Sequence, residues 1–396
     1  MSTLDMLEKK INSLNLFEGN IPEILKVTAD SIPSRSIPYR MRLTLAVSEL
    51  ITYISQFRIN IRHWNDSLIP INAITFCIAT SGASKDSSAR AVRKCFEEGY
   101  SIINKVRKEE AKNRAIAQAK DNGCDVPESF ACYKDFYKAP NPLFVGISTN
   151  EGFIQHLNDL AEDTLGAGYC FSGEFGGELS TNANLVENCK ALSELYDMGN
   201  KEVKVLKNRE NQSKEIFNLP VSALFLGSQD NILYDEAIKR KFKTEFTTKL
   251  ARRSFFVFVS EKPAEESYSS IDEMLKIEKA IENKAIQSRD EVSEYISELT
   301  EDILNLDTKE IAVDEDVRDL FTLYKKYNEE TAKAMDNQLP IAQITRTHLQ
   351  WKAFKLAGAL ALIRRSTVIE MEDYKAAIEF VELINNDVGV FEKELV

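Results

Sequence analysis

One lysine, Lys85, follows a small-residue turn at the end of an apolar run, and a helical pattern begins directly after it. Residues 73–79 are apolar and β-branched, as is typical of a buried strand. A strand, a small-residue loop, a lysine and a helix form the arrangement that holds a phosphate group, because backbone N–H groups and a helix N-terminus face the anion. The lysine amine then reaches the β and γ phosphate oxygens of a nucleotide.

The loop departs from the full pattern G-x-x-x-x-G-K-[ST] at three positions. Ala79 and Ser84 replace the two glycines, and Asp86 replaces the Ser/Thr that normally follows the lysine. Asp86 could hold Mg²⁺ directly, or Ser87 or Ser88 could supply the hydroxyl. An ordinary strand–turn–helix with a solvated lysine is equally compatible with the loop alone. The residues predicted to bind the nucleotide are Thr80, Ser81, Gly82, Ala83, Ser84, Lys85, Asp86 and Ser87, with Asp86 and Ser87 at the metal.

A second candidate is Glu174, which follows the apolar residues 167–172. A strand-end carboxylate beside a phosphate loop can polarise the water that attacks the γ-phosphate. Gly173 stands where an aspartate often helps to hold Mg²⁺. Glu178, one helical turn further on, is the weaker choice for the base. The plainer alternative is a strand-end turn with surface acids.

Two more groups complete the set of predicted catalytic residues. Gln229 or Asn231, after the apolar residues 221–226, could orient the lytic water, because open parallel sheets place ligands at the carboxyl ends of their strands. Arg252 and Arg253 precede the apolar residues 254–259, and one of them could stabilise the transferred phosphoryl group of a neighbouring subunit. A polar turn and a solvated pair at a helix end are the simpler alternatives.

Near the C-terminus, residues 346–365 form an amphipathic helical pattern that carries several cations. Core packing explains the apolar members, and the cations could be a solvated face, part of a lid over the nucleotide, or a stripe facing DNA phosphates. The cations are Arg346, Lys352, Lys355, Arg364 and Arg365.

The composition indicates an ordinary soluble protein, with 396 residues, 43% hydrophobic and 28% charged. A net charge of −12 argues against nucleic-acid binding over the whole surface, but it allows a local basic patch inside a ring. No apolar run is long enough to span a bilayer, and residues 1–20 do not resemble a secretion signal. The six cysteines form no CxxC pair, so we expect reduced thiols in a cytoplasmic protein, and Cys124 with Cys132 is only half of a zinc site.

Four regions are predicted: an N-terminal helical region at 1–66, an α/β core at 67–262, a helical insertion at 263–340 and a C-terminal helical lid at 341–396. Strands alternating with helices predict a mainly parallel sheet covered by helices. Strands are expected at 73–79, 143–148, 167–172, 221–226 and 254–259. Long helices are expected at 89–122, 271–306, 314–336, 344–363 and 371–383.

This order of elements resembles the ATPase portion of phage and prophage primase–helicase-like proteins, which are related to ring-forming replicative helicases. The resemblance covers roughly residues 67–262 and 341–385, and residues 1–66 are too short for a primase module. Its motifs look like Ser148-Thr-Asn-Glu151, Ser172-Gly-Glu-Phe-Gly176, Leu192-Ser-Glu-Leu-Tyr196, Arg252-Arg253, Lys355-Leu-Ala357 and Asp373-Tyr-Lys-Ala-Ala-Ile378.

The resemblance implies a RecA/AAA-like P-loop NTPase core with ATP and Mg²⁺ as cofactors. It implies a DNA helicase-like motor of phage replication, working as a ring, expected to be a hexamer, in the host cytoplasm. Single-stranded DNA and other phage replication proteins are the expected partners, and Lys204, Lys207 and Arg209 are the candidate DNA contacts. Two alternatives stay open: a nucleotide- or DNA-binding scaffold that does not hydrolyse ATP, and a virion or packaging protein.

Overall fold

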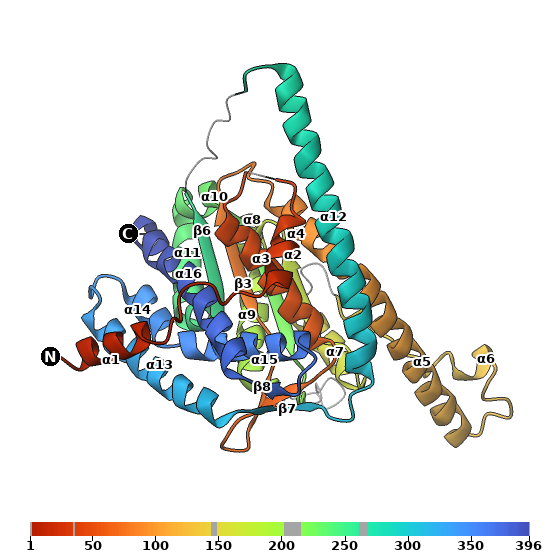
Figure 1. The fold of residues 1–396 in the computed structure, drawn as a ribbon. Helices are drawn as coiled ribbons and strands as arrows, with labels where there is room; N and C mark the ends of the chain where they lie inside the picture. The colour runs from red at the N-terminus through yellow and green to blue at the C-terminus, as the bar shows by residue number, and fades with distance from the viewer. Residues whose placement is uncertain (1, 35, 144–148, 202–214, 261–267, 396) are drawn as a thin grey trace.

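The computed structural model describes residues 2–34, 36–143, 149–201, 215–260 and 268–395, which form a mainly helical α/β protein with parallel strand pairs (Figure 1). The strands are β1 (Asn60–Arg62), β2 (Leu68–Pro70), β3 (Ile74–Ala79), β4 (Gly168–Ser172), β5 (Val221–Ser228), β6 (Ser254–Val259), β7 (Glu310–Val313) and β8 (Val368–Ile369). The helices of the first half are α1 (Thr3–Asn12), α2 (Glu23–Asp30), α3 (Tyr39–Ser55), α4 (Lys85–Lys94), α5 (Glu97–Asp121), α6 (Phe130–Tyr133), α7 (Asn150–Ala161), α8 (Phe175–Thr181) and α9 (Ala183–Met198). Those of the second half are α10 (Gln229–Leu233), α11 (Glu236–Glu245), a π-helical turn (Phe246–Leu250), a 3-10 turn (Ala251–Arg253), α12 (Ile271–Leu304), α13 (Glu315–Ala334), α14 (Pro340–Arg346), α15 (Leu349–Ile363) and α16 (Met371–Leu395).

The central sheet has the order β4-β5-β3-β6, and all of its strands are parallel. β3 is hydrogen-bonded on both sides, with Ile74 opposite Ala223 of β5 and Ser254 of β6. All six residues of β3 are buried, which explains its unbroken apolar character. The four predicted strands of this sheet are therefore confirmed, and their carboxyl ends share one edge.

Helices cover both faces of the central sheet. Alternate residues of a strand point to opposite faces, so neighbouring residues of β3 belong to different cores. Cys77 and Ala79 belong to one core, to which α3, α4, α12, α15 and α16 contribute. Phe76 and Ile78 belong to a second core, to which α7, α8, α9 and α11 contribute. The first core also includes Ile11, so the N-terminal helices pack on the same body as the sheet.

A second, mixed sheet with the order β2-β1-β7-β8 was not predicted. Its β1 lies within the region 1–66 and β7 within the region 263–340, so the expectation of helix throughout is wrong at these strands. Strands of two to four residues are too short to display a periodicity of two. Gly358 on α15 permits close packing against this sheet, because a Cβ there would lie 2.6 Å from Ile61 Cδ1.

Several predicted helix boundaries need correction, although α12 and α13 lie where they were expected. The predicted helix 89–122 is two helices, α4 and α5, separated at Cys95 and Phe96. The predicted helix 344–363 divides at Thr347 and His348, and the last helix continues to Leu395. Apolar spacing continues across such short breaks, so the sequence does not reveal them. The predicted strand 143–148 lies outside the described residues, apart from Leu143.

Two helices extend away from the body of the molecule (Figure 1). α12 has 34 residues and α5 has 25. The fully buried residues of α12 begin at Ala285, so its N-terminal half projects beyond the core. α5 carries α6 near its far end.

The cations of α15 are not on a solvated face. Lys355 donates to Pro70 O and Asn72 Oδ1 at 2.7 Å and to Tyr196 O at 2.8 Å, and its amine lies 4.4 Å from the centre of the Tyr196 ring. Lys352 donates to Ser254 O at 3.0 Å. Both lysines are buried, so the expectation of a solvated or DNA-facing stripe is wrong for them.

These contacts also locate α15 relative to the phosphate loop. Ser254 begins β6, and Asn72 precedes β3, so α15 lies at the amino end of the central sheet, the end opposite residues 79–88. α16 lies along the edge strand β6, where Asp387 accepts a 3.0 Å hydrogen bond from the Phe258 amide. The other predicted cations pair with acids: Arg346 with Glu382, Arg364 with Asp373 and Arg365 with Glu298.

We predict that the two buried lysines differ in their effect on stability. Lys355→Met removes the donor from three buried oxygens and should lower the free energy of unfolding by about 3 kcal/mol. Lys352→Met removes the donor from one acceptor, Ser254 O, and should leave this free energy within about 1 kcal/mol of the wild type, or raise it. Urea denaturation of both variants measures the difference, and equal losses would contradict the assignment.

The Lys352 variant should also change the pH dependence of stability. Burial lowers the pKa of Lys352 to about 7, whereas the unfolded chain keeps a lysine pKa of about 10.4. Between these values the unfolded state binds more protons, so stability of the wild type rises with pH. Relative to Lys352→Met, the wild type should therefore gain stability from pH 7 to pH 10. A difference that stays constant over this window would contradict the neutral folded-state amine.

Candidate functional site

The loop after β3 has left-handed backbone at two positions. Gly82 has φ +80° and Ser84 has φ +54°, and the Ala83 amide closes a turn onto Thr80 O at 3.3 Å. Ser84 directly precedes α4, whose first residue is Lys85. Turns of this kind at a helix N-terminus form concavities in which backbone N–H groups can meet an anion.

Serine hydroxyls attach this loop to its surroundings. Ser81 Oγ lies 2.6 Å from Ser228 Oγ at the end of β5, and Ser36 donates to Ala83 O at 3.2 Å. Ser87, a predicted metal ligand, donates its hydroxyl to Ser84 O at 2.9 Å. The loop therefore lies across the carboxyl end of the neighbouring strand.

Lys85 is held inside its own loop. Its side chain is 8% exposed, and Nζ lies 3.0 Å from Thr80 O and 3.4 Å from Ala79 O. Burial lowers the pKa of the Lys85 amine, while the nearby carboxylates of Glu174 and Asp230 raise it. The Lys85 amine thus has two backbone carbonyl acceptors and two acidic residues nearby.

Glu174 and Gln229 lie at the same edge of the sheet as Lys85, since each follows a parallel strand. Glu174 is exposed at the start of α8, whereas the carboxylate of Glu178 accepts a hydrogen bond from the Ser172 hydroxyl. This contact favours Glu174 as the freer carboxylate. Gln229 is 7% exposed, and its Oε1 has no hydrogen-bond partner within the described part of the chain. A buried amide oxygen normally has a partner, so Oε1 is suited to a ligand or water.

The two positions that depart most from the expected motif lie against each other. A Cβ built on Gly173 lies 3.6 Å from Asp86 Oδ1. The carboxylate of Asp86 also pairs with Arg90 at 2.5 Å. The first turn of α4 thus brings a carboxylate to the end of β4, although β5 lies between β3 and β4 in the sheet.

The donor set at this edge suits Mg²⁺ better than zinc. In the described ranges, no group of three or more His, Cys, Asp or Glu side chains could hold a metal ion. Mg²⁺ needs few protein ligands, since it binds through one or two carboxylates together with waters and phosphates. Asp86 provides a carboxylate, and the buried Ser88 hydroxyl has no partner among the residues that the structure describes.

The predicted arginines lie at the opposite end of the sheet, just before β6. Arg253 forms a two-pronged ion pair with Asp197 at 3.0 and 2.5 Å and donates to Lys249 O at 2.9 Å. Arg252 is half-buried and has no hydrogen bond or ion pair with another described residue. Neither can reach the phosphate loop of its own chain. The predicted DNA contacts Lys204, Lys207 and Arg209 lie outside the described residues.

A cationic face on α11 was not identified from the sequence. Lys239, Arg240 and Lys243 lie on one side of the helix, opposite the buried Ile238 and Phe242. The charged groups of these three cations have no ion-pair or hydrogen-bond partner in the ranges that the structure covers. The basic run at 239–243 was the available signal. Tyr234, 72% exposed, precedes this helix.

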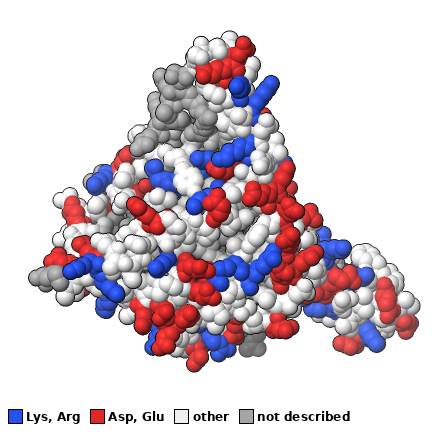
Figure 2. Space-filling model, in the orientation of Figure 1, with Lys and Arg blue, Asp and Glu red and all other residues white. Residues whose placement is uncertain are grey.

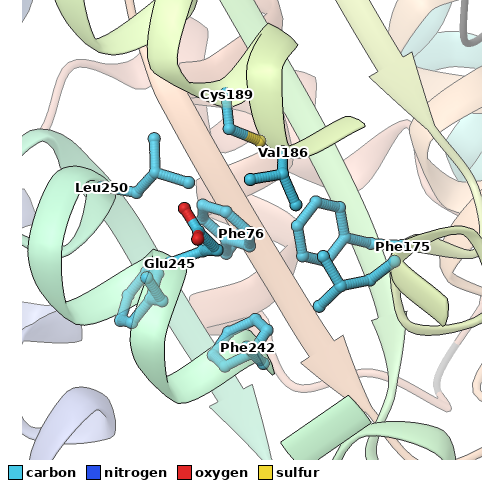
Figure 3. Close-up of a pocket in the computed structure, with 9 residues that line it drawn as sticks. Phe76, Phe175, Val186, Cys189, Phe242, Glu245 and Leu250 are labelled. Carbon is cyan, nitrogen blue, oxygen red and sulfur yellow. The ribbon is translucent and has the colours of Figure 1, made fainter. Parts of the chain in front are cut away.

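The apolar cavity in Figure 3 lies on the face of the central sheet that α8, α9 and α11 cover, and it is not part of this edge. Its volume is about 10 Å³, and Phe76, Phe175, Phe242 and Cys189 line it. Glu245, at its margin, pairs with Lys249. A space of this size holds at most one water molecule, so it is a packing gap in the second core.

No family model matches the chain, and no curated protein matches it. Within the described residues, no helix combines the length and the apolar character needed to cross a membrane. Acidic and basic side chains are interspersed over the face shown in Figure 2. Cys77, Cys95, Cys170 and Cys189 are buried free thiols, and Cys124 and Cys132 are half-buried free thiols.

We predict that Gly82 is required by the loop conformation and Gly177 is not. Open space surrounds both positions, but only Gly82 has a positive φ. Gly82→Ala should lower the free energy of unfolding by about 1 kcal/mol, because L-residues are strained in the left-handed region. Gly177→Ala, within α8, should leave it unchanged or raise it by up to about 1 kcal/mol. Thermal denaturation of both variants measures this, and identical shifts would exclude the left-handed loop.

Proposed function

We propose that this chain is an ATP-dependent DNA helicase-like motor of the phage replication class, with a RecA/AAA-like core that works as a ring. The supporting observation is the strand order β4-β5-β3-β6, which brings Lys85, Glu174 and Gln229 to one edge of a parallel sheet. Ligands of open α/β sheets bind at this edge. The left-handed loop and the buried lysine each suit an anionic ligand, and the unpartnered Gln229 oxygen can accept a hydrogen bond from a water molecule.

In this proposal each residue has a distinct role in phosphoryl transfer. The loop 80–87 holds the phosphates, and Lys85 neutralises the β and γ oxygens. Glu174 polarises the attacking water, while Gln229 orients it. A bound Mg²⁺ would neutralise the negative charge that develops on the phosphate oxygens. Asp86, with Ser87 or Ser88, supplies the oxygens of this chain that would hold the ion.

The arginines support an oligomeric site. Arg252 lies at the end of the sheet opposite the loop, so it can meet a nucleotide only on another copy of the chain. A contact between opposite ends of two copies is heterologous, and such contacts generate rings when the rotation closes. We expect a hexamer, with ATP between subunits and Arg252 acting in trans. Arg253 is the weaker candidate, because it is paired with Asp197.

Single-stranded DNA is the proposed polymer that moves through the ring. Single-strand channels combine cations that follow the backbone with aromatic side chains that stack on bases. The α11 face of Lys239, Arg240 and Lys243, with the exposed Tyr234, has this composition. This face supports the proposal that the chain binds single-stranded DNA. The predicted DNA contacts Lys204, Lys207 and Arg209 lie outside the described residues and stay predictions.

A nucleotide-binding scaffold without hydrolysis is the second candidate. The observation that favours it is the glycine at position 173, where an aspartate often holds the metal ion. Such a protein would bind ATP and DNA with the same residues and would show no turnover.

We predict that turnover of ATP depends on Lys85 and Glu174. Wild-type protein should hydrolyse ATP, and more rapidly with single-stranded DNA. Lys85→Ala should abolish binding and turnover, while Glu174→Gln should retain binding and lose turnover by about 100-fold or more. Phosphate release with and without DNA is the measurement. Bound ATP without release in the wild type would select the scaffold instead.

Two matched variants serve as controls. Lys94→Ala removes an exposed lysine from the last turn of the same helix and should leave turnover unchanged. Glu178→Gln tests the alternative base and should reduce turnover only slightly. Equal turnover in wild type, Lys85→Ala and Glu174→Gln would exclude the catalytic assignment.

We predict that α11 contributes to DNA binding through charge. Replacing Lys239, Arg240 and Lys243 by Gln should reduce the salt dependence of single-stranded DNA affinity by about 2 in the log–log slope, since each phosphate contact contributes about 0.7. The control replaces Lys325, Lys326 and Lys333 on α13, whose amines pair with Glu329 or Glu330. Fluorescence anisotropy over a salt series measures both, and an unchanged slope in the α11 variant excludes this surface.

A further inference from the structure

We propose that Cys124 and Cys132, at the far end of the arm formed by α5 and α6, form a disulfide bond under oxidising conditions and so close the loop between them (Figure 1). Both residues are free, half-buried thiols. Neither cysteine belongs to the proposed nucleotide site, so the inference does not rest on the proposed function.

The end of α5 fixes the position of Cys124. Asn122 caps the helix, and Gly123 follows with φ +81°, the left-handed conformation that commonly ends a helix. The Cys124 amide then donates to Ala119 O at 3.0 Å. Cys124 is therefore attached to the last turn of α5 by a backbone hydrogen bond.

Side-chain packing fixes the position of Cys132. Cys132 lies in α6, and its neighbour Tyr133 is buried in a small core with Ala115 and Ala119 of α5. Cys124 packs against the same core. These three buried residues are all that this core contains within the described ranges. A core of this size contributes little stability, and folds with small cores commonly rely on covalent links.

The two cysteines are in contact. The Cys124 thiol donates to Cys132 O at 3.7 Å. Burial raises the pKa of the Cys124 thiol, and a hydrogen bond with the Cys132 side chain raises it further. A disulfide joins residues whose Cα atoms are about 4–7 Å apart, and these contacts are compatible with that separation.

The other four cysteines are less accessible to an oxidant. Oxidation of a thiol requires an accessible sulfur. The remaining cysteines are buried in the two large cores that cover the central sheet, and they are Cys77, Cys95, Cys170 and Cys189. The pair on the arm is therefore expected to react first.

The reaction is a thiol–disulfide exchange with a small-molecule disulfide as the oxidant. One protein thiol loses its proton, and its thiolate attacks the oxidant and releases one half of it as a thiolate. The second protein thiol loses its proton in turn, attacks the mixed disulfide and releases the other half. Two protein thiols are thus oxidised to one S–S bond. The oxidant is reduced to two thiols, which take up the two protons.

The bond would restrain the tip of the arm. The loop between the cysteines includes Val126 and Phe130, whose side chains are 57% and 63% exposed. A cross-link removes conformational freedom from the open loop, so the ends of α5 and α6 should separate less often. The oxidised arm would therefore present these two apolar side chains on a more rigid loop.

The test incubates the reduced full-length chain with oxidised glutathione, blocks the remaining thiols and maps the peptides by mass spectrometry. The native wild type should give a peptide linked through Cys124 and Cys132, with the buried cysteines still reduced. Cys124→Ser and Cys132→Ser should each carry glutathione on the remaining thiol of the arm, because no second thiol resolves the mixed disulfide. Cys189→Ala, the matched control in the second core, should form the bond as the wild type does.

Hydrogen exchange measures the effect on the arm. Oxidation should slow amide exchange in residues 119–137 by about tenfold or more in the wild type and leave it unchanged in Cys124→Ser. Glutathione on both cysteines without the internal bond, or a bond that forms only in urea, would overturn the proposal. An internal bond without slower exchange would overturn the restraint of the arm. These measurements need no nucleotide, so their failure leaves the proposed function untouched.

Discussion

The central position of β3 is the constraint on which the candidate site depends. This strand is buried over its whole length and hydrogen-bonded to β5 and β6, so its register with both neighbours is fixed. In a parallel sheet the carboxyl ends of all strands point the same way, and whatever follows them meets at one edge. Residues that are distant in the sequence, Lys85, Glu174 and Gln229, come to that edge for this reason. Helices lie on both faces because parallel strands are joined by crossover connections, and because the apolar side chains on both faces of the sheet must be buried.

The two ends of this sheet use buried lysines in different ways. At the amino end, Lys355 has three oxygens within 2.8 Å and an aromatic ring, which together satisfy the amine. At the carboxyl end, Lys85 has two backbone carbonyls, at 3.0 and 3.4 Å. A buried structural amine needs hydrogen-bond acceptors for its N–H groups. An amine with fewer close acceptors can accommodate a new anionic partner. The contrast supports a structural role for Lys355 and is consistent with the proposed role of Lys85 at the opposite end of the same sheet.

The two arginines predicted to act in catalysis do not lie at the loop of their own chain, which is consistent with the geometry of the sheet. Arg252 precedes β6 and therefore lies at the amino end, as far from the loop as the strand is long. A residue at that end of the sheet cannot contact a nucleotide at the loop of its own chain. The strand direction is compatible with the proposed ring, in which Arg252 would act on the nucleotide of another copy.

The sequence by itself determined the four central strands, α12 and the order of strand-end polar residues, because long apolar runs and helical spacing are local properties. It did not determine the second sheet, whose strands of two to four residues carry no periodicity and are stabilised only by pairing. The predicted solvated or DNA-facing stripe was wrong for Lys352 and Lys355, because a pattern of charged residues does not show which carbonyl groups will surround a lysine in the fold. Only the tertiary structure decided that Asp86 lies against Gly173. That contact joins two segments across an intervening strand, and no local rule of spacing can express it.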